Sequence, residues 1–79
     1  MARVLLFGRL ADQAGWRDRR IEAGDLSTLR AVLSAADPDL GAALAGPGVQ
    51  VAVDKVLVRG EAALTTGAEV AFLPPMSGG

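Results

Sequence analysis

One stretch with helical spacing lies between several short apolar runs, and this order limits the folds open to the chain. Within residues 26–36 the apolar positions recur at intervals of three and four: Leu26, Leu29, Val32, Leu33 and Ala36. This spacing predicts one main helix, whose start Ser27 can cap. Four other segments have the short apolar or alternating patterns typical of strands: residues 4–7, 49–53, 56–59 and 70–73. One long helix among several strands packs most simply as two layers.

The segments between these elements complete a predicted order. Residues 9–14 are expected to form a brief helix, and residues 16–22, charged in their middle, an edge strand. Asp37-Pro38 should end the main helix, and Pro38 can open a second helical turn through Leu44. Loops or turns are expected at residues 24–25, 45–48 and 65–67. The order predicts an α+β fold of the β-grasp, or ubiquitin-like, type, in which the first strand lies beside the last and both are central.

The composition excludes several kinds of chemistry. The chain has 79 residues and contains no Cys and no His, so it lacks a thiolate nucleophile, an imidazole base and the common soft metal ligands. Its nine acidic residues lie in turn-like or charge-mixed stretches and predict no acid–base pair and no metal site. The net charge of −1 and the acid within the cluster at residues 16–20 argue against nucleic-acid binding. No apolar run is long enough to cross a bilayer.

The last six residues form the strongest candidate site. We expect a β-grasp domain over residues 1–73 and a protruding tail over residues 74–79. Pro74 and Pro75 lack amide donors, so they stop sheet pairing and form a stiff stem. Gly78-Gly79 carries no side chains and can enter a narrow slot, so the carboxylate of Gly79 is the expected reactive group. Fully extended, the tail reaches at most about 20 Å, enough to enter a neighbouring protein.

Four segments of the sequence resemble one known family. They are residues 4–10 (VLLFGRL), 51–54 (VAVD), 64–72 (LTTGAEVAF) and 74–79 (PPMSGG). They are similar to the small subunit of molybdopterin synthase, the MoaD-type sulfur carrier of the MoaD/ThiS family. Asp54 stands where that family often has Asn in a tight turn, and both residues suit such a turn.

The resemblance implies a sulfur-carrier function. An adenylyltransferase of the ubiquitin-activating type would use ATP to adenylate Gly79, and a sulfur donor would convert it to 1-thioglycine, a thiocarboxylate. The tail (Pro74, Pro75, Met76, Ser77, Gly78 and Gly79) would then thread into the large subunit of molybdopterin synthase and deliver sulfur to cyclic pyranopterin monophosphate. The resemblance also implies a heterotetramer with that subunit, a cytoplasmic location, no bound cofactor, and catalytic groups on the large subunit.

Strand alternation adds a candidate docking surface for the partner. If Val4, Leu6, Val70 and Phe72 face the helix, then Leu5, Phe7, Ala71 and Leu73 face the other way. We expect Phe7, Leu57 and Leu73 to form the partner interface, with Val56 and Val58 facing inward. The alternative is that these residues fill a minor cluster under a loop. Lys55 and Arg59 are expected to be solvated, with contact to an acidic surface of the activating enzyme left open.

Three other functions stay open at this point. A thiamine-pathway sulfur carrier shares the fold and the Gly-Gly ending, but is typically shorter and lacks the Pro-Pro stem. A ubiquitin-like modifier would join Gly79 to lysines of target proteins. A plain interaction module would carry an inert tail.

Overall fold

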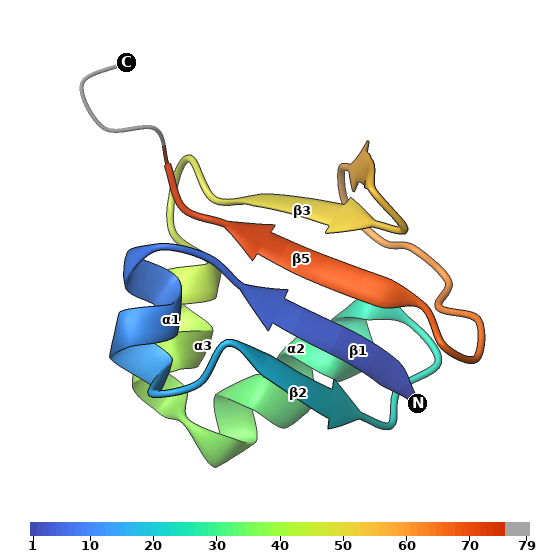
Figure 1. Cartoon of the computed structure of the whole chain (residues 1–79), viewed down its shortest axis with the longest axis horizontal. Helices are drawn as coiled ribbons and strands as arrows, with labels where there is room; N and C mark the ends of the chain where they lie inside the picture. The colour runs from blue at the N-terminus through green and yellow to red at the C-terminus, as the bar shows by residue number, and fades with distance from the viewer. Residues whose placement is uncertain (76–79) are drawn as a thin grey trace.

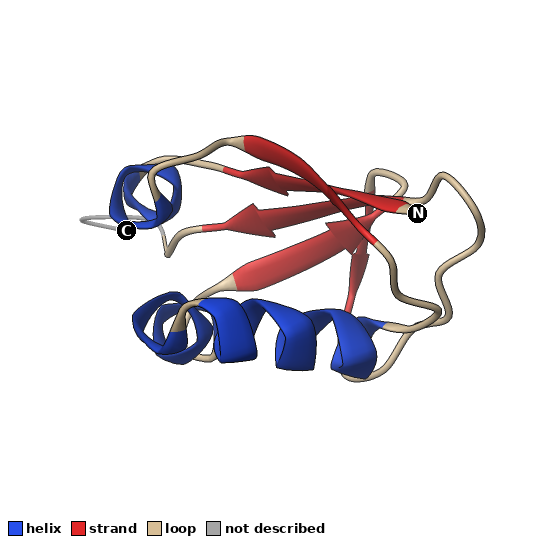
Figure 2. Cartoon of the chain, turned by 90° about the horizontal axis from the view of Figure 1, so that it is seen from below, coloured by secondary structure: helices blue, strands red, loops and turns tan. Residues whose placement is uncertain are grey.

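The structure, a computed structural model, describes residues 1–75 and is built in two layers (Figures 1 and 2). A five-stranded sheet forms one layer, α2 and α3 cover one of its faces, and α1 lies at one end of it. The elements are β1 (Ala2–Leu6), α1 (Arg9–Ala14), β2 (Asp18–Ile21), α2 (Leu26–Ala36), α3 (Pro38–Leu44), β3 (Gln50–Val53), β4 (Val56–Val58) and β5 (Glu69–Leu73). The predicted α+β class is confirmed.

The strand order of the sheet is β2-β1-β5-β3-β4. β1 and β5 run parallel, and every other neighbouring pair is antiparallel. The first strand therefore lies beside the last, as the sequence predicts, and β5 is the middle strand. β2 is an edge strand, also as predicted, although it begins at Asp18 instead of Trp16.

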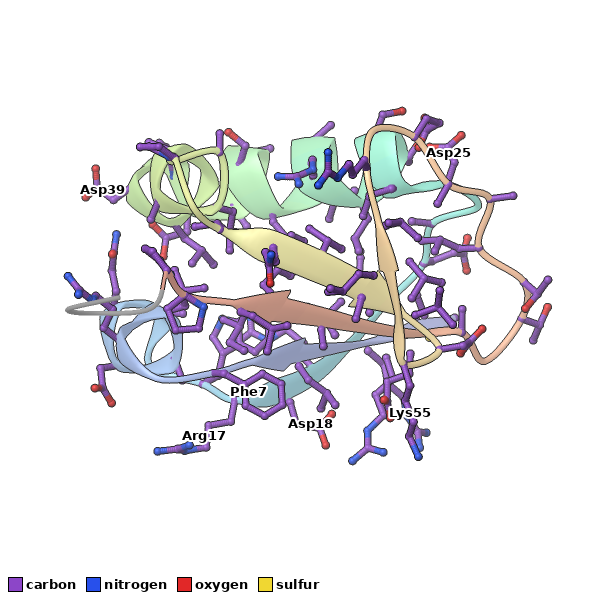
Figure 3. All side chains as sticks on the ribbon, turned by 90° about the horizontal axis from the view of Figure 1, so that it is seen from above. Phe7, Arg17, Asp18, Asp25, Asp39 and Lys55 are labelled. Carbon is purple, nitrogen blue, oxygen red and sulfur yellow. The ribbon has the colours of Figure 1, made fainter. Side chains whose placement is uncertain are left out.

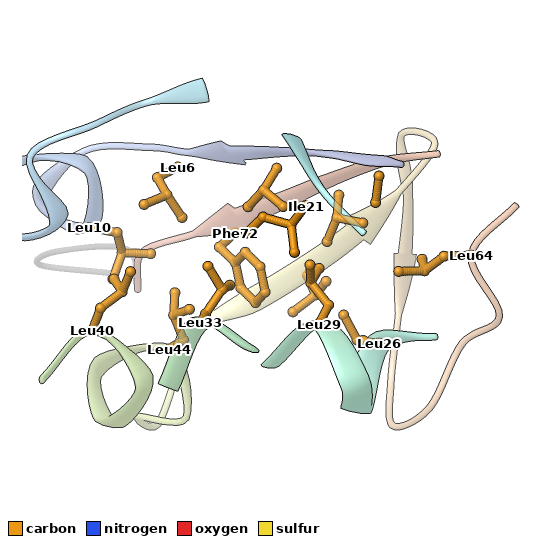
Figure 4. Close-up of a cluster of buried hydrophobic side chains, with 14 of the residues drawn as sticks. Leu6, Leu10, Ile21, Leu26, Leu29, Leu33, Leu40, Leu44, Leu64 and Phe72 are labelled. Atoms are coloured by element: carbon orange, nitrogen blue, oxygen red, sulfur yellow. The ribbon is translucent and has the colours of Figure 1, made fainter. Parts of the chain in front are cut away.

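The core lies between the sheet and α2 (Figure 4). Val4, Leu6, Val70 and Phe72 alternate along the two central strands, and each is at most 2 % exposed. Leu26, Leu29 and Leu33 of α2 cover them from the other layer. Because strand residues alternate between faces, the neighbours of these core residues point to the open face of the sheet.

The main helix begins differently from the prediction. Its N-cap is Asp25, whose Oδ1 accepts a 2.8 Å hydrogen bond from the backbone N–H of Thr28. The prediction that Ser27 caps the helix was wrong: Ser27 is the second helical residue, and its hydroxyl donates to Asp25. Glu61 adds a second carboxylate at this helix start by accepting from the Ser27 N–H at 3.0 Å. Both carboxylates satisfy donors that the first helical turn leaves free.

Two residues expected on the buried face of α2 are exposed. Val32 is 40 % exposed, and Ala36 is also exposed. The buried stripe of α2 consists of Leu26, Leu29 and Leu33 and is therefore narrower than the apolar spacing suggests. Helices in a two-layer domain contact the sheet along one side only, so flanking apolar residues can stay in solvent.

A tight hairpin joins β3 to β4. Its two turn residues, Asp54 and Lys55, both have positive φ, 49° and 70°. This is the type I′ geometry that matches the twist of a two-residue hairpin. Asp54 also ties the turn to β5, because its Oδ1 accepts from the Glu69 N–H at 3.0 Å and its N–H donates to the Glu69 carbonyl.

Candidate functional site at the end of the central strands

The two central strands end at the same side of the sheet. β1 and β5 are parallel, and the Phe7 N–H extends their pairing by donating to the Phe72 carbonyl at 3.3 Å. Beyond this point β1 leads into α1, and β5 leads into Pro74 and Pro75 (Figure 1). The start of the tail is thus attached to the middle strand of the domain.

Two glycines hold the proline stem. A Cβ built on Gly8 would lie 3.0 Å from Pro74 Cγ, and one built on Gly48 would lie 2.8 Å from Pro75 Cβ. Both glycines have positive φ, 56° and 84°. The Gly8 conformation (φ 56°, ψ −135°) is one that residues with a Cβ avoid. The β1–α1 turn and the α3–β3 loop therefore lie directly against the two prolines.

A concave surface of about 260 Å³ lies beside Pro75. α1 contributes Arg9 and Gln13, and the α3–β3 loop contributes Gly46 and Pro47. Gln13 is fixed by a hydrogen bond from its Nε2 to the Asp39 carbonyl at 3.1 Å. The start of the tail is therefore bordered by one cationic side chain and several apolar groups.

Phe7 and Leu73 lie next to each other on the open face of the sheet. They follow the register pair Leu6 and Phe72, and Phe7 is 43 % exposed while Leu73 is half-buried. Figure 3 shows Phe7 on the side of the sheet away from α2. We call Phe7 and Leu73, with their half-buried neighbours Leu5 and Ala71, the open-face patch.

Leu57 faces the same side of the sheet as the open-face patch, because it pairs with Ala52, which in turn pairs with Ala71. It is 58 % exposed and sits on β4, which is separated from β5 by β3. Strand spacing puts it about 10 Å from β5, and it is also among the residues that line a cleft beside α2. Val58 packs against the core, and Val56 lies on the same face, opposite Val53, as expected; Val56 is nevertheless 64 % exposed, because it lies at the end of an edge strand.

Charged residues occupy the other end of the open face. Arg3 Nη2 and Asp18 Oδ2 are 2.6 Å apart, and Arg3 Nη1 lies 3.9 Å from Glu69 Oε1. The hydrogen bonds from Arg3 lower the pKa of Asp18, and those same bonds raise the pKa of Arg3. The open face is therefore apolar beside the tail and ionic at the opposite end.

Other predicted site residues fall outside the structure's description. Met76, Ser77, Gly78 and Gly79 lie beyond the described residues, so their predicted roles stay predictions, as does the domain boundary at residue 73. Within residues 1–75, no cluster of three or more acidic side chains could hold a metal ion. No helix in the same range has the length and apolarity to cross a bilayer.

Sequence reasoning missed the roles of Gly8 and Gly48. Gly8 is predictable as the end of a strand and Gly48 as part of a loop, but neither position reveals that it touches the stem. The sequence does contain glycines and a proline pair, and these fit together physically: proline rings are bulky and rigid, and glycine allows the closest backbone approach. Contact between residues 8, 48 and 74–75 became visible only with the fold.

Comparison with known proteins agrees with this architecture. The solved structure "Crystal structure of SAMP1 from Haloferax volcanii" matches with a TM-score of 0.86 and 26 % identity, covering 99 % of this chain and 98 % of that one. No curated protein sequence matches the chain significantly. The model of the ThiS family matches residues 4–79, nearly the whole chain. The chain therefore belongs to the ThiS family and has the ubiquitin-like β-grasp fold of its sulfur carriers.

Proposed function

We propose that the chain is the sulfur-carrier subunit of a molybdopterin synthase and that Gly79 carries the sulfur. One observation supports this most directly. The middle strand β5 leads into Pro74 and Pro75, which Gly8 and Gly48 hold beside an exposed apolar surface. Family membership and the Gly78-Gly79 sequence supply the chemistry that this arrangement would present to a partner.

The proposed chemistry takes place at the carbonyl carbon of Gly79. Its carboxylate oxygen attacks the α-phosphorus of ATP on an activating enzyme, pyrophosphate leaves, and an acyl-adenylate forms. Hydrosulfide then attacks the acyl carbon, AMP leaves, and a thiocarboxylate (1-thioglycine) results. In the active site of the large subunit the thiocarboxylate sulfur bonds to a carbon of cyclic pyranopterin monophosphate, and water then cleaves the acyl C–S bond, which leaves the sulfur on the pterin and restores the Gly79 carboxylate. The chain supplies no general acid or base in this scheme, in keeping with a sequence that has no Cys and no His.

The open-face patch is the surface we propose for the large subunit. Phe7 and Leu73 are exposed or half-buried beside the stem, so a partner that covers them is correctly placed to receive the tail. Burial of apolar area at an interface stabilises a complex by about 25 cal/mol per Å². Replacing Phe7 or Leu73 with a charged residue should therefore weaken the complex. In this proposal the complex is a heterotetramer and acts in the cytoplasm.

Intact-mass measurement tests the loading step. The protein is incubated with an adenylyltransferase of the ubiquitin-activating type, ATP and sulfide, and we expect a mass gain equal to one oxygen replaced by sulfur, located in the C-terminal peptide. A chain lacking Gly79 is the matched control and should gain nothing. An unchanged mass in the full chain, or an equal gain in the control, would refute the proposed site.

Two further assays separate the proposal from its alternatives. The loaded chain should convert cyclic pyranopterin monophosphate when mixed with a molybdopterin synthase large subunit, whereas a thiamine-pathway carrier should not. Denaturing electrophoresis of cell extracts should show the free chain only. A ladder of larger conjugates would instead favour a ubiquitin-like modifier.

A further inference from the structure

The two edges of the sheet differ in chemistry. At one edge, β2 carries two arginines and an aspartate, charges that discourage pairing with another chain. At the other edge, β4 consists of Val56, Leu57 and Val58, and the first two are 64 % and 58 % exposed. An apolar edge strand with a free ladder side can accept an added strand.

The register of the hairpin determines which groups β4 offers. The two-residue type I′ turn at residues 54–55 makes Val53 and Val56 the closing pair of the ladder. Hydrogen-bonded and non-hydrogen-bonded pairs alternate in an antiparallel ladder, so Leu57, opposite Ala52, takes the next, non-hydrogen-bonded position. The N–H and C=O of Leu57 therefore point away from β3, toward the free edge.

Beside β4 lies a cleft of about 290 Å³ between α2 and the β3–β4 hairpin. Its apolar lining includes Leu26, Val51, Leu57 and Val58, and its two charged residues are Arg30 and Arg59. Within the described residues, the lining of this cleft contains no acidic side chain. Arg30 is partly engaged, because its Nη1 donates to the Leu44 carbonyl at 3.3 Å.

Charge at the ends of β4 disfavours a second copy of the chain as the occupant. The strand is flanked by Lys55 and Arg59. An antiparallel pairing of two β4 strands centred on Leu57 would bring Lys55, in the turn before β4 of each copy, close to Arg59 of the other. Like charges directly opposite destabilise a strand pair, whereas opposite charges stabilise it. The edge is therefore complementary to a strand with acidic ends.

We propose that β4 binds an extended segment of another protein as a sixth strand, antiparallel to β4. The segment has an acidic residue at each end, opposite Lys55 and Arg59, and apolar residues between them. Its main chain pairs with the N–H and C=O of Leu57, and one apolar side chain enters the cleft next to Arg30. The added strand would lie beyond β4 at the edge of the sheet and does not involve the tail, whereas the open-face patch lies on β1 and β5.

Titration with a synthetic peptide tests this proposal. The probe has five residues, with glutamate at both ends and valine, threonine and valine between, and its ends are blocked. Amide resonances of the ¹⁵N-labelled full chain at residues 56–59 should shift on titration, with intermolecular NOEs to Leu57. The matched peptide with lysine at both ends should bind at least about fivefold more weakly, since two favourable ion pairs become repulsive. Absence of shifts at millimolar peptide, or equal binding of both peptides, would overturn the proposal.

Two variants test the contributions of charge and backbone. Arg59→Glu should weaken binding of the glutamate-ended peptide about fivefold or more, while Arg17→Glu, an equal charge change at an exposed residue beside β2, should not. Leu57→Pro removes the outward N–H and should abolish binding, since an edge position tolerates proline. If the amide shifts at residues 56–59 depend on protein concentration without peptide, and sedimentation shows a dimer, then a second copy occupies the edge and the proposal is wrong. Peptide binding at β4 does not depend on Gly79, so failure of this proposal can be distinguished from failure of the proposed sulfur-carrier function.

Discussion

Replacing Gly48 with alanine tests whether the α3–β3 loop holds the start of the tail. Gly48 has φ 84°, and a Cβ there would lie 2.8 Å from Pro75 Cβ, closer than real Cβ atoms approach. Gly15 provides a matched control, because it also has φ 84° but no atom lies within 4 Å of its Cβ position. Alanine at either position must adopt the same positive φ, and only Gly48→Ala meets the proline ring.

The two variants should therefore differ by the cost of the steric contact. A left-handed conformation costs an L-residue about 1–2 kcal/mol, so Gly15→Ala should lower the free energy of unfolding by that amount. An overpacked contact adds about 1–3 kcal/mol, so Gly48→Ala should lose about 2–5 kcal/mol in all. A domain of this size has a stability of about 4–12 kcal/mol, so Gly48→Ala is at the limit of what the fold tolerates.

Urea denaturation measures both losses, and ¹³C chemical shifts of Pro75 report the contact directly. In a Pro75→Gly background the Pro75 Cβ is gone, so Gly48→Ala should lower the free energy of unfolding by no more than Gly15→Ala does in the natural chain. Equal losses for Gly15→Ala and Gly48→Ala, together with unchanged Pro75 shifts, would refute the idea that the loop holds the stem. In that case Gly48→Ala should also be loaded by the activating enzyme to the same extent as the natural chain.

Three further predictions concern the fold that carries the site. Phe72→Ala, at a fully buried position, should cost about 3–5 kcal/mol and leave the domain largely unfolded in mild urea. Asp54→Ala should lose about 1 kcal/mol through the bond to the Glu69 N–H and the left-handed turn, while Asp54→Asn should lose less, as measured by thermal denaturation. Hydrogen bonds from Thr28 lower the pKa of Asp25, so the unfolded chain takes up its proton first as pH falls. Stability should therefore be full above about pH 4, the unfolded value, and decline below it, and Asp25→Asn should flatten that acid limb in a pH series of thermal melts.

Local patterns in the sequence were enough to predict the order of the elements. The spacing of leucines from Leu26 to Leu33 and the alternation through β1, β3 and β5 are properties of each segment alone, and they match the structure. The face toward which Val4, Leu6 and Phe72 point was also predictable, because a strand has only two faces.

Features that depend on tertiary geometry were not predictable. Val32 and Val56 are apolar and well placed in their own elements, yet both are exposed: Val32 lies outside the buried stripe of α2, and Val56 lies on an edge strand. The helix cap required a choice between Asp25 and Ser27, which a sequence pattern alone does not make. The glycine contacts to the stem bring together three distant segments of the chain, and no local signal specifies their distance.

The attachment of the tail to the middle strand has a mechanical consequence. β5 is hydrogen-bonded to β1 on one side and β3 on the other, so tension applied beyond Pro75 acts along the strand and loads both ladders at once. Bonds loaded together in shear resist more force than bonds opened one at a time, and extraction of β5 would also pull Phe72 from the core. A partner can therefore draw strongly on this end of the molecule while the domain stays folded, and a motor that unfolds proteins from the same end would meet the strongest resistance first.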